Sequence, residues 1–94
     1  MAKVEINFVG PWRLVTGVRT TRAEIQSLAD AAELIRASFQ PAYEKKLKSM
    51  GVRKMHSIWD NSNLMVNGKS VKQSDPVTFK DGDRLDLIPR VAGG

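Results

Sequence analysis

The chain has 94 residues and a formal net charge of +5, which fits one small domain with a single modest core. Hydrophobic residues make up 41% of the sequence and charged residues 27%, both ordinary for a globular protein. Cysteine is absent, which excludes disulfides, thiolate metal sites and thiol nucleophiles. No apolar run is long enough to span a membrane, and residues 1–6 lack the continuous apolar stretch of a signal peptide. We therefore expect a cytoplasmic protein.

Two strands are predicted in the first third of the chain. Apolar residues alternate with polar ones at the start, which indicates a strand with one buried face, and its apolar positions are Val4, Ile6 and Phe8. Gly10-Pro11 ends this strand. The apolar residues that follow are expected in a loop over the end of the core; they are Trp12, Leu14 and Val15. A second strand is predicted over residues 18–25, where Arg and Thr alternate poorly.

A helix is predicted next, with Ser27 as its N-cap and Asp30 as the partner in a capping box. Residues 28–39 carry apolar side chains at helical spacing, namely Leu28, Ala31, Ala32, Ile35 and Phe39. Pro41 either ends this helix or begins a second short one. The second option is favoured by the i, i+4, i+7 spacing of Tyr43, Leu47 and Met50, with Gly51 suited to the C-cap.

The last third of the chain predicts short strands. Asn67-Gly68 is a strong hairpin signal between residues 63–66 and the return strand 69–71. Asp75-Pro76 and Asp81-Gly82 mark further turns. Leu85 and Leu87 alternate with polar residues in a final strand that Pro89 closes. The fold class is therefore α+β, with a helix packed across a mixed sheet. Expected core residues are Val4, Ile6, Phe8, Leu28, Ile35, Phe39, Leu64 or Met65, Val66, Leu85 and Leu87.

Residues 45–54 form the densest basic stretch, with five cations and no acid. Such a stretch can bind nucleic acid. It can also be a solvated helical face, which we favour because lysine outnumbers arginine and no aromatic residue is interleaved. A third interpretation is docking onto an acidic partner enzyme.

The sequence ends in Ala92-Gly93-Gly94. Because glycine has no side chain beyond hydrogen, a diglycine end makes a thin thread that can enter another enzyme's narrow active site. The reacting group would then be the carboxylate of Gly94. Small terminal residues are also common without any function.

Three stretches give the chain a resemblance to the MoaD/ThiS family of sulfur carriers. They are residues 8–17 (FVGPWRLVTG), 66–69 (VNGK) and 79–94 (FKDGDRLDLIPRVAGG), the last with a turn, a strand, a proline and the diglycine in family order. The resemblance implies a ubiquitin-like β-grasp domain over residues 1–89 and a flexible tail over 90–94. Two features depart from the family pattern. Arg90 replaces a usual second proline, and residues 41–62 form a longer, more basic connection.

By this resemblance, an E1-like enzyme uses ATP to adenylate Gly94, and a sulfur donor displaces AMP to leave a thiocarboxylate. Gly93 and Ala92 keep the approach free of bulk. A molybdopterin-synthase-type large subunit would then receive the sulfur. The chain itself would be a carrier without stably bound cofactor, not an enzyme. Alternatives are a ubiquitin-like modifier joined through Gly94 to lysine, and a small basic nucleic-acid-binding domain.

Metal sites and catalytic groups are not expected. Asp81-Gly82-Asp83 is interpreted as a tight turn, because an EF-hand needs ligands out to a glutamate at position twelve. His56 is the only histidine, so a zinc site or a histidine-based triad is not expected.

Strand parity predicts a docking surface at the root of the tail. With Phe8 and Leu87 inward, Val9 and Ile88 should point to the outer face and neighbour each other as an exposed apolar patch. Arg13, Arg84 or Arg90 would form its rim, and the adjoining partner-binding residues would be Pro89, Val91 and Ala92. The competing interpretation is a local twist or bulge that covers either apolar residue.

Overall fold

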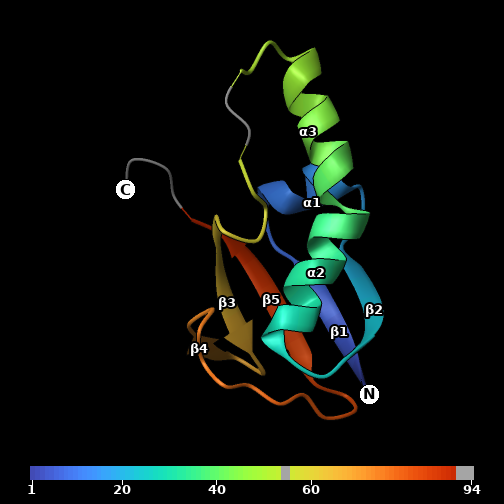
Figure 1. The fold of residues 1–94 in the computed structure, drawn as a ribbon, viewed down its shortest axis with the longest axis vertical. Coiled ribbons are helices and arrows are strands. Elements are labelled where there is room, and N and C mark those ends of the chain that lie inside the picture. Colours follow the sequence, from blue (N-terminus) through green and yellow to red (C-terminus); the bar gives the residue numbers. More distant parts are fainter. Residues whose placement is uncertain (54–55, 91–94) are drawn as a thin grey trace.

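The structure is a computed structural model that describes residues 1–53 and 56–90 (Figure 1). Within these residues five strands form one mixed sheet in the order β2-β1-β5-β3-β4. The strands are β1 (Ala2–Phe8), β2 (Thr20–Ile25), β3 (Ser62–Val66), β4 (Lys69–Val71) and β5 (Arg84–Pro89). The helices are α1 (Pro11–Thr16), α2 (Leu28–Ser38) and α3 (Gln40–Ser49). β1 and β5 are parallel neighbours, whereas the other pairs are antiparallel. The predicted α+β architecture is confirmed.

The alternating pattern of β1 produces the core as predicted. Val4, Ile6 and Phe8 are buried, while Lys3 and Glu5 lie exposed on the opposite face of the sheet. Burying an aliphatic or aromatic side chain of this size contributes about 1.5–3 kcal/mol, so this strand alone is a major source of stability. Leu28 and Ile35 from α2 and Leu64, Leu85 and Leu87 from the sheet complete the predicted buried set. Phe39 and Val66 are half-buried against this core.

The prediction of a loop after Gly10-Pro11 is wrong, because residues 11–16 form the short helix α1. Pro11 occupies the first turn of the helix, where its missing N–H is not needed. Gly17 ends it in the left-handed conformation with φ 77°, which glycine adopts at no steric cost. Trp12 is buried and its indole Nε1–H donates to Ser62 Oγ at 2.9 Å, whereas Leu14 is exposed. α1 therefore closes one end of the core through Trp12.

α2 begins where the sequence predicts, and its capping box is present. Ser27 Oγ accepts from the Asp30 N–H at 3.2 Å, while the Asp30 carboxylate accepts from the Ser27 N–H at 3.3 Å. The alternative of a second helix after it is confirmed by α3, which has Pro41 in its first turn. Figure 1 shows α2 crossing the sheet and α3 continuing beyond it. α3 has no buried residue, but Tyr43 packs edge-on against Trp12 with ring centroids 5.5 Å apart.

The predicted Asn67-Gly68 hairpin joins β3 and β4, with both turn residues at positive φ. Asn67 also fastens this hairpin to the start of β5. Its side-chain amide donates to Asp83 Oδ1 at 2.9 Å, and its side-chain oxygen accepts from the Arg84 N–H at 2.9 Å. Turn chemistry and sheet pairing therefore depend on the same asparagine.

Part of the core comes from segments that the sequence did not assign to it. These buried residues are Ile58, Trp59 and Phe79. No helix of the described residues is long and apolar enough to cross a membrane.

Candidate functional site

The candidate site is the outer face of β5 near Pro89, where the chain leads to the diglycine. Val91, Ala92, Gly93 and Gly94, which the sequence assigned to the tail, lie outside the described residues. The last described residue, Arg90, is still tied to the sheet, because its N–H donates to the Asn61 carbonyl at 2.8 Å. The chain is therefore fixed to the sheet as far as Arg90.

The parity prediction for β5 is confirmed. Leu85 and Leu87 are fully buried, and Ile88 lies on the opposite face of the sheet. The parallel register pairs Phe8 with Leu87, and the Val9 N–H continues it by donating to the Leu87 carbonyl at 3.0 Å. Val9 and Ile88 are therefore neighbours, as predicted. Both are half-buried and not exposed, so the prediction of an exposed patch is wrong in that respect.

A polar cluster that the sequence interpretation missed lies beside Ile88 on the same face. Asp86 is only 8% exposed, and its Oδ1 accepts a hydrogen bond from the Asn7 side chain and forms an ion pair with Arg84 Nε, each at 3.2 Å. Arg84 is thus engaged with Asp86 and not a free cation on the rim. The sequence could have indicated this cluster, because Arg84, Asp86 and Ile88 are alternate residues of one strand and therefore lie on the same face.

Arg13 has a different role from Arg84. Its Nε donates to the Phe8 carbonyl at 2.9 Å, which holds its side chain across the end of β1. This places a guanidinium at the junction of α1 and β1. The predicted position of Arg13 on the rim of the Val9–Ile88 pair stays a prediction.

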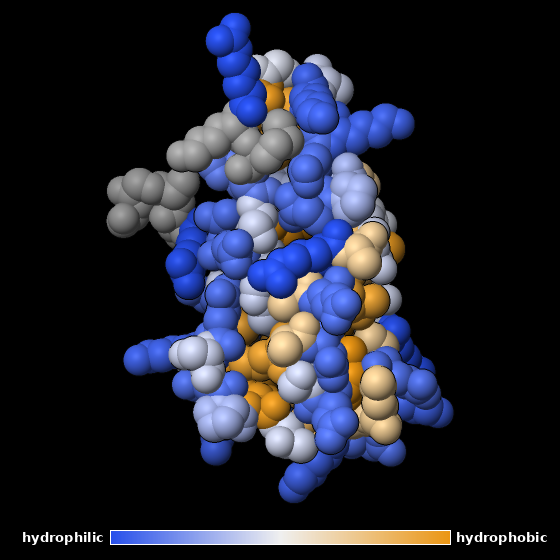
Figure 2. Space-filling model, in the orientation of Figure 1, coloured by the Kyte–Doolittle hydropathy of each residue, from blue (hydrophilic) through white to orange (hydrophobic). Residues whose placement is uncertain are grey.

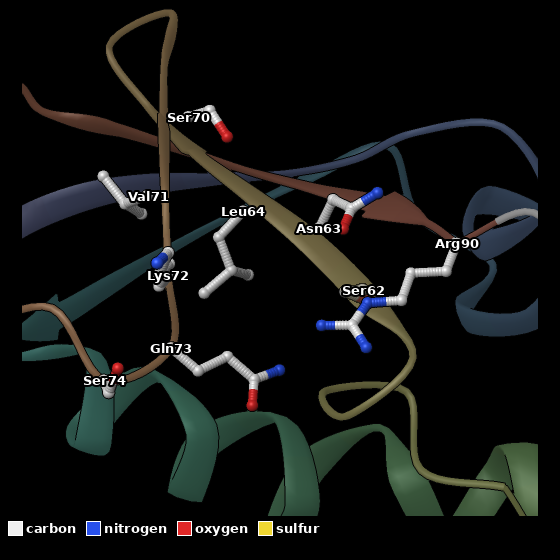
Figure 3. Close-up of a pocket in the computed structure, with 9 residues that line it drawn as sticks. All are labelled: Ser62, Asn63, Leu64, Ser70, Val71, Lys72, Gln73, Ser74 and Arg90. Carbon is white, nitrogen blue, oxygen red and sulfur yellow. The ribbon is translucent and has the colours of Figure 1, made fainter.

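Arg90 lines a groove of about 520 Å³ along the β3–β4 edge (Figure 3). In this view its guanidinium reaches over Ser62, and Lys72 lies across the groove. The remaining lining is polar apart from Leu64 and Val71, and consists of Ser62, Asn63, Ser70, Gln73 and Ser74. Arg90 and Pro89 also border a smaller cavity of about 210 Å³ beside Trp12 and Tyr43. The root of the tail is therefore flanked by cavities on two sides.

The basic segment forms the exposed surface of α3 and the residues after it. Lys45, Lys46, Lys48 and Arg53 are all exposed, and Lys46 Nζ donates to the Leu14 carbonyl at 3.3 Å. Figure 2 shows hydrophilic side chains over most of this end of the molecule. Exposure fits each of the three interpretations given for this segment, which remain predictions.

Two titratable groups have shifted pKa values, and both are explained by the fold. Hydrogen bonds from the Lys80 N–H and the Asn67 side chain lower the pKa of the Asp83 carboxyl. Burial raises the pKa of the Tyr43 phenol. Neither group is placed for catalysis, because Asp83 stabilises a turn and Tyr43 packs against Trp12.

The Asp81-Gly82-Asp83 segment is a turn, as predicted. Asp81 Oδ1 accepts from the Lys3 N–H and Asp83 Oδ2 from the Lys80 N–H, each at 2.8 Å, and Gly82 has φ 89°. Both carboxylates are therefore used to fix the entry into β5. Among residues 1–53 and 56–90, no group of three His, Asp or Glu side chains is placed to hold a metal ion.

Comparison with solved structures matches this architecture over nearly the whole chain. A putative molybdopterin converting factor subunit 1 from Pyrococcus furiosus has a TM-score of 0.66 at 22% identity, covering 97% of this chain and 100% of its own. SAMP1 from Haloferax volcanii has 0.63 at 26%, covering 99% and 100%. The complex of subunits 1 and 2 of the molybdopterin-converting factor from Helicobacter pylori gives 0.60 at 19%, covering 98% and 99%.

The fold is that of the ubiquitin-like sulfur carriers. The resemblance expected from the sequence is thereby confirmed, including the β-grasp arrangement of a mixed sheet with helices packed across it. No protein-family model matches the chain, and the search of curated proteins found no significant match. The neighbours are small carrier or modifier proteins, and some were solved in complex with a partner protein.

Proposed function

We propose that this protein is a sulfur carrier whose Gly94 carboxylate is adenylated by an E1-like enzyme and converted to a thiocarboxylate. The observation that carries the proposal is the fold match to carrier proteins over nearly the full length of both chains. The match includes β5, which ends at Pro89 shortly before the diglycine. A carboxylate is a poor electrophile, so ATP-driven adenylation by the partner would precede any transfer of sulfur.

Within this proposal the described residues provide docking and orientation. Val9 and Ile88 offer a small apolar contact at the root of the tail, and Arg13 and Arg90 offer cations beside it. The buried Asp86, held by Asn7 and Arg84, keeps the adjoining part of this face rigid. We assign the acceptor as a molybdopterin-synthase-type large subunit, which is supported by the similarity to the converting-factor subunit.

A ubiquitin-like modifier is the second candidate, and the similarity to SAMP1, a small archaeal modifier protein, favours it. In that case the adenylated Gly94 would form an isopeptide bond with a lysine. Both candidates need the same activation, so they differ only in the fate of the carboxyl carbon.

The test is intact-mass analysis of the full chain purified from its native host. A carrier shows exchange of one oxygen for sulfur at Gly94, and a modifier shows higher-mass adducts joined through Gly94. A matched variant lacking Gly94 should show neither product while its circular dichroism remains unchanged. A chain that carries neither mass change in the host contradicts both candidates.

A further inference from the structure

β2 is the outermost strand on one side of the sheet, so the backbone groups along its free edge pair with no other strand of the sheet. Its hydrogen-bonding direction is fixed by the bond from the Phe8 N–H to the Arg19 carbonyl at 2.7 Å, which continues the β1–β2 register. In an antiparallel pair, alternate residues point their N–H and C=O groups toward the partner strand. Residues 21, 23 and 25 therefore bond to β1, whereas Thr20, Arg22 and Glu24 direct their backbone groups to the free edge.

The outer-face side chains near this edge alternate in charge. Glu24 lies opposite Lys3, and Arg22 lies opposite Glu5, in the β1–β2 register. All four side chains belong to exposed residues. Charges usually discourage a second strand from adding to an edge. If the antiparallel copy places each charge of this edge opposite a charge of the other sign, the charges instead favour the addition of that copy.

We propose that the chain forms a symmetric dimer by antiparallel addition of β2 to β2 of a second copy, centred on Ala23. In this register Arg22 faces Glu24 of the partner subunit, and the two-fold axis repeats the pair. Each row across the four strands then reads Glu5, Arg22, Glu24, Lys3, with alternating charge throughout. Opposite charges directly across a strand pair are stabilising, and like charges are destabilising.

The neighbouring registers are less favourable, two because of like charges and one because of its length. Only Thr20, Arg22 and Glu24 can form hydrogen-bonded pairs at this edge, so the possible registers are few. Centring on Arg22 sets two arginines face to face, and centring on Glu24 sets two glutamates face to face. Centring on Thr21 shortens the pairing and leaves Glu24 without a partner. The arrangement is isologous and closes after two copies.

An opening of about 400 Å³ lies beside this edge, between β2 and α2. Its lining combines the apolar residues Met1, Ala23, Ile25, Leu34 and Ala37 with the charged residues Arg22, Glu24, Asp30 and Glu33. Figure 2 shows hydrophobic surface beside α2 on the side of β2. β1 separates β2 from β5, so the dimer leaves both copies of the Pro89 end free.

The experiment is sedimentation equilibrium of the full chain from micromolar to millimolar concentration. Wild-type protein should show a monomer–dimer equilibrium. Arg22→Glu and Glu24→Arg should each raise the dimer dissociation constant at least about tenfold, because each sets like charges opposite each other twice. An equimolar mixture of the two variants should dimerise again, since both pairs that face each other across the interface are then of opposite charge. Lys69→Glu makes the same charge change as Arg22→Glu on the other edge strand, β4, and should leave the equilibrium unchanged.

A wild-type chain that stays monomeric at millimolar concentration overturns the proposal. So does a dimer that persists in both single variants, or a mixture that fails to associate although both variants fold by circular dichroism. If either variant does not fold, hydrogen exchange of the backbone amides in the wild-type chain tests the β2 interface instead. The Arg22 and Glu24 amides should become more protected as protein concentration rises, and unchanged protection contradicts the β2 interface.

Discussion

Trp12→Phe tests whether α1 closes the core as the structure shows. The substitution removes the indole N–H that donates to Ser62 Oγ, which contributes about 0.5–1.5 kcal/mol. It also shrinks a side chain that is only 6% exposed, and the cavity left behind adds roughly 1–2 kcal/mol. Ser62 keeps its own bond to the Ile58 carbonyl, so no buried hydroxyl is left unpaired. We expect a total loss of about 2–3 kcal/mol.

Thermal and urea unfolding followed by far-ultraviolet circular dichroism measure this loss. For a domain of this size, about 2–3 kcal/mol lowers the Tm by roughly 10–20 °C. Leu14→Ala is the matched control, because Leu14 lies in the same helix and is 77% exposed. It should change stability by no more than about 0.5 kcal/mol. A Trp12→Phe variant as stable as Leu14→Ala would refute the packing of α1 and restore the loop interpretation.

Three further outcomes follow from single residues. Asn67→Ala should destabilise the domain by about 1–2 kcal/mol in urea unfolding, because it removes two side-chain hydrogen bonds and places alanine at φ 51°. Lys69→Ala is the control, and a smaller loss for Asn67→Ala than for Lys69→Ala would contradict this prediction. The pKa of Asp83 is lowered in the folded state, so its ionised carboxylate stabilises the fold at pH values above the unfolded pKa. This contribution is lost as the pH falls through the folded pKa. Asp83→Asn should therefore make the urea midpoint less dependent on pH in the acid range. Ile88→Asp should cost about 1–2 kcal/mol yet leave a folded domain, since the lost side chain is half-buried and the new carboxylate lies near Asp86; complete unfolding would place Ile88 in the core.

Local patterns were sufficient to predict the elements that depend on local chemistry. The alternation around Ile6 predicted β1, Ser27 with Asp30 predicted the start of α2, and Asn67-Gly68 predicted the β3–β4 hairpin. In each case the residues that form the element also supply its signal. The alternation of side chains along β5 then placed Ile88 on the outer face, because successive side chains of a strand point to opposite faces whatever strands it pairs with.

The sequence failed where distant residues decide the outcome. Residues 11–16 are too few to show a helical period, and α1 is held mainly through the contact of Trp12 with Ser62 and Tyr43. Ile58 and Trp59 lie outside the regular elements, so no periodicity marked them as core. The burial of Asp86 required knowing that Asn7 of β1 would lie opposite it on the neighbouring strand and donate to its carboxylate.

The position of α3 bears on which partners the tail can reach. α3 and α1 stand at the same end of the sheet as Pro89, and Tyr43 and Pro89 border one cavity. Under the proposed function, a partner that takes the diglycine into its active site would bind at this end of the molecule, where the lysines of α3 are exposed. Clustered like charge at that entrance accelerates encounter with an acidic surface and slows encounter with a basic one. Under the proposed function we therefore expect the longer basic connection to favour acidic partners over basic ones, while the chemistry at Gly94 would be common to carriers and modifiers.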